Sequence, residues 1–146
     1  MLHSTAPAPV AVAAAMAALE LLEEQPRRVE KLLDNAETLR DELAREGFEV
    51  AGSCTHIVPL LVGAAQPAAR IVEYALEQGV FCEAAQPSGA PDGAARLRLA
   101  VMASHTRAEL RGAAAVLARA ALRAGIRHGA GDPVAIAQFD ELPRAA

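Results

Sequence analysis

The segment of residues 96–101 constrains the fold of this chain more than any other, because its apolar and polar residues alternate with a period of two. This period is typical of a β-strand with one apolar face. The pattern breaks at residues 103–105, and Thr106 with Glu109 three residues later has the sequence signature of a helix-capping box. We therefore predict a strand that turns directly into a helix running to about Ala124.

The polar face of this strand carries two guanidinium groups, from Arg96 and Arg98. A guanidinium that is fixed next to a tight strand-to-helix turn can bind a carboxylate through two parallel hydrogen bonds, which would make the strand part of an anion site. A strand arginine can equally belong to a solvated face or to a surface ion pair. The segment alone leaves both interpretations open.

Two more helices are predicted from the spacing of apolar residues. Residues 26–46 place apolar side chains three and four positions apart, which indicates an amphipathic helix with one buried stripe. Gly47 is suited to end that helix. A helix over residues 67–78 has the same type of spacing and is expected to end before Gly79.

Short strands are expected over residues 48–50, 56–62 and 80–82, in addition to the alternating segment. Pro59 cannot donate a ladder hydrogen bond from its nitrogen, so it places its strand at an edge of the sheet or at a bulge. Short strands separated by helices and by a turn-rich loop favour an α+β fold. We predict a small, mostly antiparallel sheet with helices packed on one face.

The helix expected over residues 9–24 differs from the others, because it is apolar nearly all round. We expect it to be covered on several sides, by other parts of the same protein or by a second subunit. The predicted organisation is therefore a leading segment with a linking helix over residues 1–24, a small domain over residues 25–125, and a loosely held tail over residues 126–146.

Composition argues against several classes of function. The net charge of −4 gives no electrostatic basis for binding nucleic acid. The first residues lack the basic segment of a secretory signal, and the Ala-rich run that follows ends in glutamates before it is long enough to span a membrane. We therefore expect a cytoplasmic protein.

Metal binding and hydrolysis are also considered from the residue types. The candidate zinc ligands are Cys54, His56, Cys82 and His105, but their spacing matches no Cys-x-x-Cys pair. Two buried small side chains are the preferred interpretation of the cysteines. Ser104 and His105 are adjacent, but the sequence does not indicate a further residue that would complete a hydrolytic triad with them. We predict neither a bound metal nor a triad.

Four segments, taken in order, resemble the α-oxoamine synthase family. The family motifs are Phe-Ser-Thr-Ala/Ser-Leu-Pro-Pro, Ser-x-Ile-Val-Pro, Gly-Val-Phe-Val with a Pro-rich loop, and Arg-Leu-Arg-Leu/Ile with Ala-Ala-His-Thr. The matching segments are His3–Ala6 before Pro9, Thr55–Pro59, Gly79–Phe81 with Pro87, Pro91 and Gly93, and Arg96–Leu99 with Ala103–Thr106. The resemblance spans residues 3–124 and is greatest to 8-amino-7-oxononanoate synthases.

Members of this family are pyridoxal-phosphate enzymes of the aspartate-aminotransferase fold and normally form obligate dimers. They condense an amino acid with an acyl-CoA or acyl-carrier thioester. The resemblance implies that this chain is the C-terminal portion of such an acyltransferase, as a truncated reading, a piece of a split enzyme or a remnant. The Schiff-base lysine would then belong to the large domain.

Lys31, the only lysine, agrees with this implication. It is predicted on the polar side of a helix with acidic neighbours, which does not provide the environment that an imine-forming amine requires. We therefore expect no catalysis by this chain alone. The alternative hypothesis is a free-standing α+β module that binds a partner or effector without catalysis.

The resemblance also implies roles for single residues. Arg98 matches the family arginine that holds the carboxylate of the amino-acid substrate, which orients the bond to be broken relative to the cofactor. Ser4 and Thr5 match the position that reaches the cofactor phosphate in the neighbouring subunit, although Thr5 could also be a simple residue at the start of a helix. Gln86 and residues 88–90 depart from the family loop, which leaves the acyl specificity open.

Overall fold

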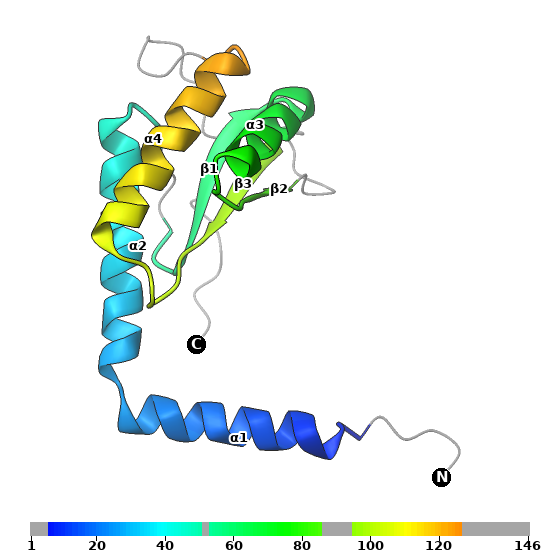
Figure 1. Ribbon diagram of the computed structural model, residues 1–146, viewed down its shortest axis with the longest axis vertical. Coiled ribbons are helices and arrows are strands. Elements are labelled where there is room, and N and C mark those ends of the chain that lie inside the picture. Colours follow the sequence, from blue (N-terminus) through cyan, green and yellow to red (C-terminus); the bar gives the residue numbers. More distant parts are fainter. Residues whose placement is uncertain (1–5, 51–52, 86–94, 127–146) are drawn as a thin grey trace, which may run out of the picture.

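The computed structural model describes residues 6–50, 53–85 and 95–126, and these contain four helices and three strands (Figure 1). In chain order the elements are α1 (Pro9–Glu24), α2 (Arg27–Arg45), β1 (Ile57–Gly63), α3 (Ala65–Glu77), β2 (Glu83–Ala85), β3 (Ala95–Ala100) and α4 (Arg107–Arg123). None of the helices in these ranges is long and apolar enough to cross a membrane.

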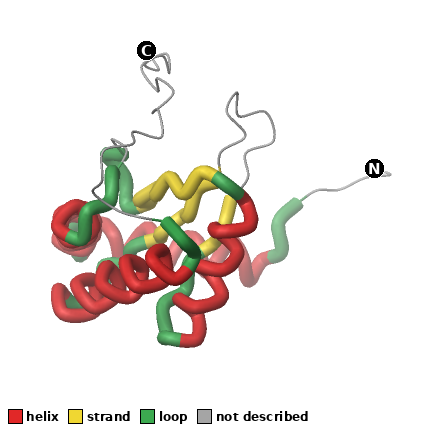
Figure 2. The backbone as a smooth tube through the Cα atoms, turned by 90° about the horizontal axis from the view of Figure 1, so that it is seen from above, coloured by secondary structure: helices red, strands yellow, loops and turns green. Residues whose placement is uncertain are grey.

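The three strands form one antiparallel sheet in the order β1-β3-β2. β1 therefore lies at an edge, as Pro59 predicts, and a register shift between Leu61 and Gly63 makes the end of this strand irregular. Figure 2 shows the helices on one side of the strands. These features confirm the predicted α+β fold with a small antiparallel sheet and helices on one face.

The alternation of residues along β1 and β3 gives the sheet one buried and one open face. Val58 and Leu60 of β1 pair with Leu99 and Leu97 of β3, and all four side chains are buried. The largest fully buried side chains come from α2, α3, α4 and these two strands: Leu43, Leu60, Ile71, Leu97, Leu117 and Val58. The apolar face that the sequence predicts for β3 is therefore the centre of the core.

Helix α4 packs against both α2 and α3. Its buried positions are mostly alanines, whose small side chains allow helices to pack closely. A buried carboxylate adds a polar link on one side, because Glu42 of α2 accepts from Arg45 at 2.7 Å and from Arg111 of α4 at 3.5 Å. The cationic partners compensate for the removal of this carboxylate from water.

Three helix ends agree with the sequence prediction. Gly47 and Gly79 follow α2 and α3 with positive φ values of 88° and 81°, a conformation that glycine adopts without the steric cost of a Cβ atom. At the start of α4, Thr106 and Glu109 form both hydrogen bonds of the capping box.

Residues 80–82 do not form the strand that the sequence predicts, because β2 begins only at Glu83. The backbone N–H of Val80 donates to the carbonyl of Ala75 at 2.8 Å, so it completes the end of α3 and is not available for the sheet. The apolar character of residues 80–82 gives no sign in the sequence that the end of α3 and the sheet compete for the N–H of Val80.

Residues 48–50 also fall short of the expected strand. Only Val50 pairs with the sheet, in a single bridge to Leu60. The N–H of Phe48 donates to the carbonyl of Leu43 at 3.0 Å, so this segment too is partly used to close the preceding helix.

Helix α1 has no buried residue within the part of the chain that the structure describes. In Figure 1 it extends away from the sheet and the other helices. Its large apolar side chains are exposed, namely Val10, Val12, Met16, Leu19, Leu21 and Leu22. The cover that its sequence demands is not supplied by the described residues, and such an apolar surface is typical of an interface.

Candidate functional site

The open face of the sheet presents the arginine that the sequence singles out. In the register, Arg98 of β3 lies between Pro59 of β1 and Glu83 of β2. Its Nη1 atom is 3.1 Å from Oε2 of Glu83, and the two side chains are 52% and 54% exposed. The guanidinium is thus held on the face of the sheet that the described helices leave open, where it contacts a carboxylate.

This ion pair is a weak restraint on Arg98. An exposed pair of this kind contributes about 0–1 kcal/mol, because water screens the attraction and both side chains lose freedom. Another carboxylate could therefore replace Glu83 at little cost, especially one that engages both arms of the guanidinium. The neighbouring Arg96 is less exposed and pairs in register with Leu61 and Ala85.

A hydrogen-bonded turn fixes the end of β3 and the start of α4. Asn35 of α2 is buried, and its Nδ2 atom donates to the carbonyl oxygens of Met102 at 3.0 Å and His105 at 2.9 Å. Within the turn, the N–H of Met102 donates to Nδ1 of His105 at 3.2 Å. Because Nδ1 accepts this bond, the neutral ring carries its proton on Nε2.

The capping box perturbs one carboxyl group at this turn. The backbone N–H of Thr106 donates to Oε2 of Glu109 at 2.7 Å, and the threonine hydroxyl lies 2.9 Å from the same oxygen. These bonds favour the ionised form, so they lower the pKa of Glu109 below its ordinary value.

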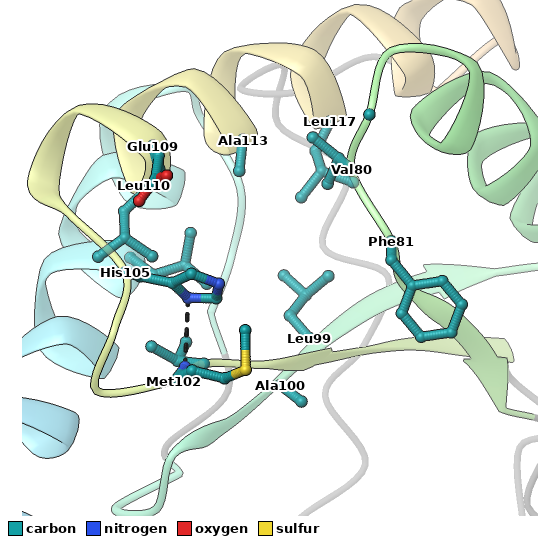
Figure 3. Close-up of a pocket in the computed structure, with 13 residues that line it drawn as sticks. Val80, Phe81, Leu99, Ala100, Met102, His105, Glu109, Leu110, Ala113 and Leu117 are labelled. Carbon is teal, nitrogen blue, oxygen red and sulfur yellow. Dashed lines mark hydrogen bonds between the residues drawn. The ribbon is translucent and has the colours of Figure 1, made fainter.

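A cavity of about 450 Å³ lies where β3 ends, beside α4 and the segment between α3 and β2 (Figure 3). Its lining is mainly apolar, and Leu99, Met102 and Leu110 are among the side chains that form it. His105 and Glu109 are the titratable groups of its lining. Such a lining suits an apolar group, and Arg98 does not contribute to it.

The other residues considered in the sequence are dispersed. Cys54 is exposed, whereas Cys82 is buried, and burial raises the pKa of its thiol. In the described ranges, no three His, Cys, Asp or Glu side chains gather closely enough to hold a metal ion. Ser104 lines a different hollow from His105.

Several predicted positions lie outside the described residues. These are Ser4 and Thr5, the loop of residues 86–94 with its departures from the family pattern, and the tail from residue 127 onward. Lys31 is described, and it is exposed on α2.

Two residues at the site did not emerge from the sequence. Glu83 was not associated with Arg98 because the pairing depends on the register of β2 against β3. Asn35 could have been found, since it interrupts the apolar stripe of α2 between Leu32 and Leu39. A polar residue within such a stripe signals a buried hydrogen-bonding role.

Comparison with known proteins identifies the family. The sequence model described as "Aminotransferase class I and II" matches residues 1–117. The 8-amino-7-oxononanoate synthase of Citrifermentans bemidjiense is 37% identical over 127 residues, which cover 86% of this chain and 33% of that protein. The 8-amino-7-oxononanoate synthase/2-amino-3-ketobutyrate coenzyme A ligase of Thermus thermophilus is 40% identical over 125 residues, covering 86% of this chain and 32% of that protein.

A solved structure supports the same assignment. A serine palmitoyltransferase from S. paucimobilis, solved with a bound PLP–myriocin aldimine, superimposes with a TM-score of 0.75 at 26% identity, and the match covers 84% of this chain and 31% of that one. The chain thus spans about a third of the length of these relatives. The predicted resemblance and the aminotransferase-type fold are confirmed, and the chain belongs to the class I and II aminotransferase family.

Proposed function

We propose that this chain supplies the C-terminal part of a pyridoxal-phosphate-dependent acyltransferase, which condenses an amino acid with an acyl thioester as 8-amino-7-oxononanoate synthases do. The relatives named above support the reaction class. The observation that carries the proposal is the position of Arg98 on the open face of the sheet, where its one ion pair among the described residues is the exposed contact with Glu83. A carboxylate clamp needs both accessibility and a fixed strand.

In this proposal Arg98 binds the carboxylate of the amino-acid substrate. Its planar guanidinium has two donors in the geometry of a carboxylate, and β3 holds its backbone in the middle of the sheet. Glu83 pairs with the guanidinium in the absence of substrate and is displaced when the substrate carboxylate binds. Ser4 and Thr5 are proposed to reach the cofactor phosphate of a neighbouring subunit.

The residues of this chain do not fit a covalent site for the cofactor. Lys31 is exposed on α2 and lines an open hollow with Arg27 and Arg28, and Arg98 is not among the residues that line this hollow. The imine-forming lysine is therefore proposed to come from the two thirds of the relatives' length that this chain does not span. On this view the chain is not catalytic alone.

The assembly follows from α1. We propose that residues 1–24 link the small domain of residues 25–125 to a large domain, and that the complete enzyme is a homodimer. The exposed apolar surface of α1 would be covered in that assembly. A free-standing binding module is the alternative, and in that case the apolar surface of α1 would be covered by the bound partner and not by a large domain.

Complementation tests the proposal. The chain is mixed or co-expressed with the remaining two thirds of an 8-amino-7-oxononanoate synthase relative, and thiol release from an acyl thioester is measured with amino acid and pyridoxal phosphate. We expect activity from the pair and none from either piece. Activity of the pair that persists with Arg98→Ala at unchanged amino-acid KM would contradict the assigned clamp.

Reading the coding DNA upstream of Met1 provides an independent test. An in-frame extension that encodes a lysine within a large domain would support the proposal. The absence of any such extension or of a complementing gene product would favour the binding module.

A further inference from the structure

A hollow of about 560 Å³ lies between the junction of α1 with α2 and the turn that follows β3. It is lined by Glu24, Gln25, Pro26, Arg27, Arg28, Lys31, Ala103 and Ser104. Three of these side chains are cationic and one is anionic, whereas the whole chain has a net charge of −4. The hollow is therefore a local concentration of positive charge on an acidic chain.

The cationic groups of this hollow are available to a ligand. Arg27 and Lys31 are one helical turn apart and so lie on the same face of α2. Within the described ranges neither forms a salt bridge, including one to Glu24. Arg28 donates from Nε to Oε1 of Gln25 at 2.6 Å, which orients its guanidinium and leaves the terminal nitrogens free of that bond.

The opposite wall of the hollow is fixed to the same helix. Ser104 lies in the turn between Met102 and His105, and the buried Asn35 donates to the carbonyls of both of those residues. Asn35 follows Lys31 by one helical turn. The backbone that carries Ser104 is thus fixed to the helix that carries the cations before any ligand arrives, which lowers the cost of binding.

We propose that this hollow binds a phosphate-bearing small molecule. A phosphate monoester carries a charge of about −1.5 to −2 at neutral pH and three strong acceptor oxygens. That charge matches the excess of cations over carboxylate in the lining, and the oxygens match donors from three cationic side chains and a serine hydroxyl. A single carboxylate would neutralise only part of this charge. The inference does not depend on the acyl-transfer proposal.

Equilibrium dialysis of the full chain against radiolabelled inorganic phosphate tests the site. We expect saturable binding of one phosphate per chain, which weakens as ionic strength rises. Arg27→Gln and Lys31→Gln should each weaken binding by about tenfold, as expected for the loss of one charge-assisted contact. Arg119→Gln, which removes an exposed arginine of α4, is the matched control and should bind as the wild type does.

The outcomes distinguish the inference from general charge attraction. Absence of saturable binding would overturn it, as would an equal loss in the control and in the two α2 variants. Competition then identifies the source of the phosphate. Displacement by coenzyme A but not by pantetheine, which lacks phosphate, indicates a phosphorylated carrier; displacement by neither indicates free phosphate. Displacement by pantetheine would show recognition of the organic arm and overturn the inference.

Discussion

At the scale of the residue, the most specific functional prediction concerns Arg98. In the complete enzyme, Arg98→Ala should raise the amino-acid KM by about 10- to 100-fold, because the bonds of a guanidinium to a carboxylate contribute about 1.5–3 kcal/mol. Glu83→Gln is the matched comparison, since it removes the competing carboxylate and should leave this KM unchanged or lower it. Steady-state kinetics with varied amino acid measure both effects.

The contrast between these two variants separates a clamp from a surface ion pair. If the two side chains only stabilise the sheet, both variants should reduce stability slightly and neither should change the amino-acid KM. A rise of similar size in both variants would contradict the role assigned to Glu83, because the guanidinium would then need its partner for positioning.

Asn35 supports a second prediction at this scale, on stability. Asn35→Ala leaves the carbonyls of Met102 and His105 without their buried donor, so the free energy of unfolding should fall by about 1–3 kcal/mol. Urea denaturation of the chain measures the change. Glu37→Ala, an exposed substitution on the same helix, is the control and should change stability far less. Equal effects of the two substitutions would count against the turn as a fixed structure.

At the scale of the element, α4 carries a pH prediction through its capping box. Bonds from Thr106 lower the pKa of Glu109 in the folded chain, so ionised Glu109 stabilises the fold above the pKa that it has when unfolded. This contribution is lost as the pH falls through the folded pKa. The stability advantage of the wild type over Glu109→Gln should therefore be present at neutral pH and decline below about pH 4.3. Unfolding followed by circular dichroism at pH 7 and pH 3 measures it; a difference that stays constant would contradict the prediction.

The individual helices and strands show which features could be predicted from the sequence. The alternation around Leu97 and Leu99, the capping box of α4 and the glycine after α2 are local patterns, and each produced the expected element. The strand predicted over residues 80–82 is wrong, because the N–H of Val80 completes the end of α3 and is therefore not available to the sheet. The contact between Arg98 and Glu83 was beyond prediction, since it depends on which strands pair and in what register.

At the scale of the whole molecule, the described residues form a buried core to which helix α1 does not contribute. The described residues from α2 to α4 bury a continuous set of apolar side chains around the sheet. Helix α1 contributes none of them, yet it has six large exposed apolar side chains. A chain with this division contains one self-contained core and one surface that gains stability only by contact with another protein surface.

This division predicts that the isolated chain associates with itself through α1. Burial of apolar surface contributes about 25 cal/mol per Å², so α1 surfaces from two chains should pair when no larger partner covers them. Met16→Glu combined with Leu19→Glu places two charges on one face of α1 and should shift the chain towards the monomer in light scattering. Leu76→Glu with Leu122→Glu exchanges two comparably exposed leucines on α3 and its neighbour α4, and should leave association unchanged. Both double variants add the same charge. If both were monomeric, the added charge alone would explain the loss of association, and α1 would not be the interface.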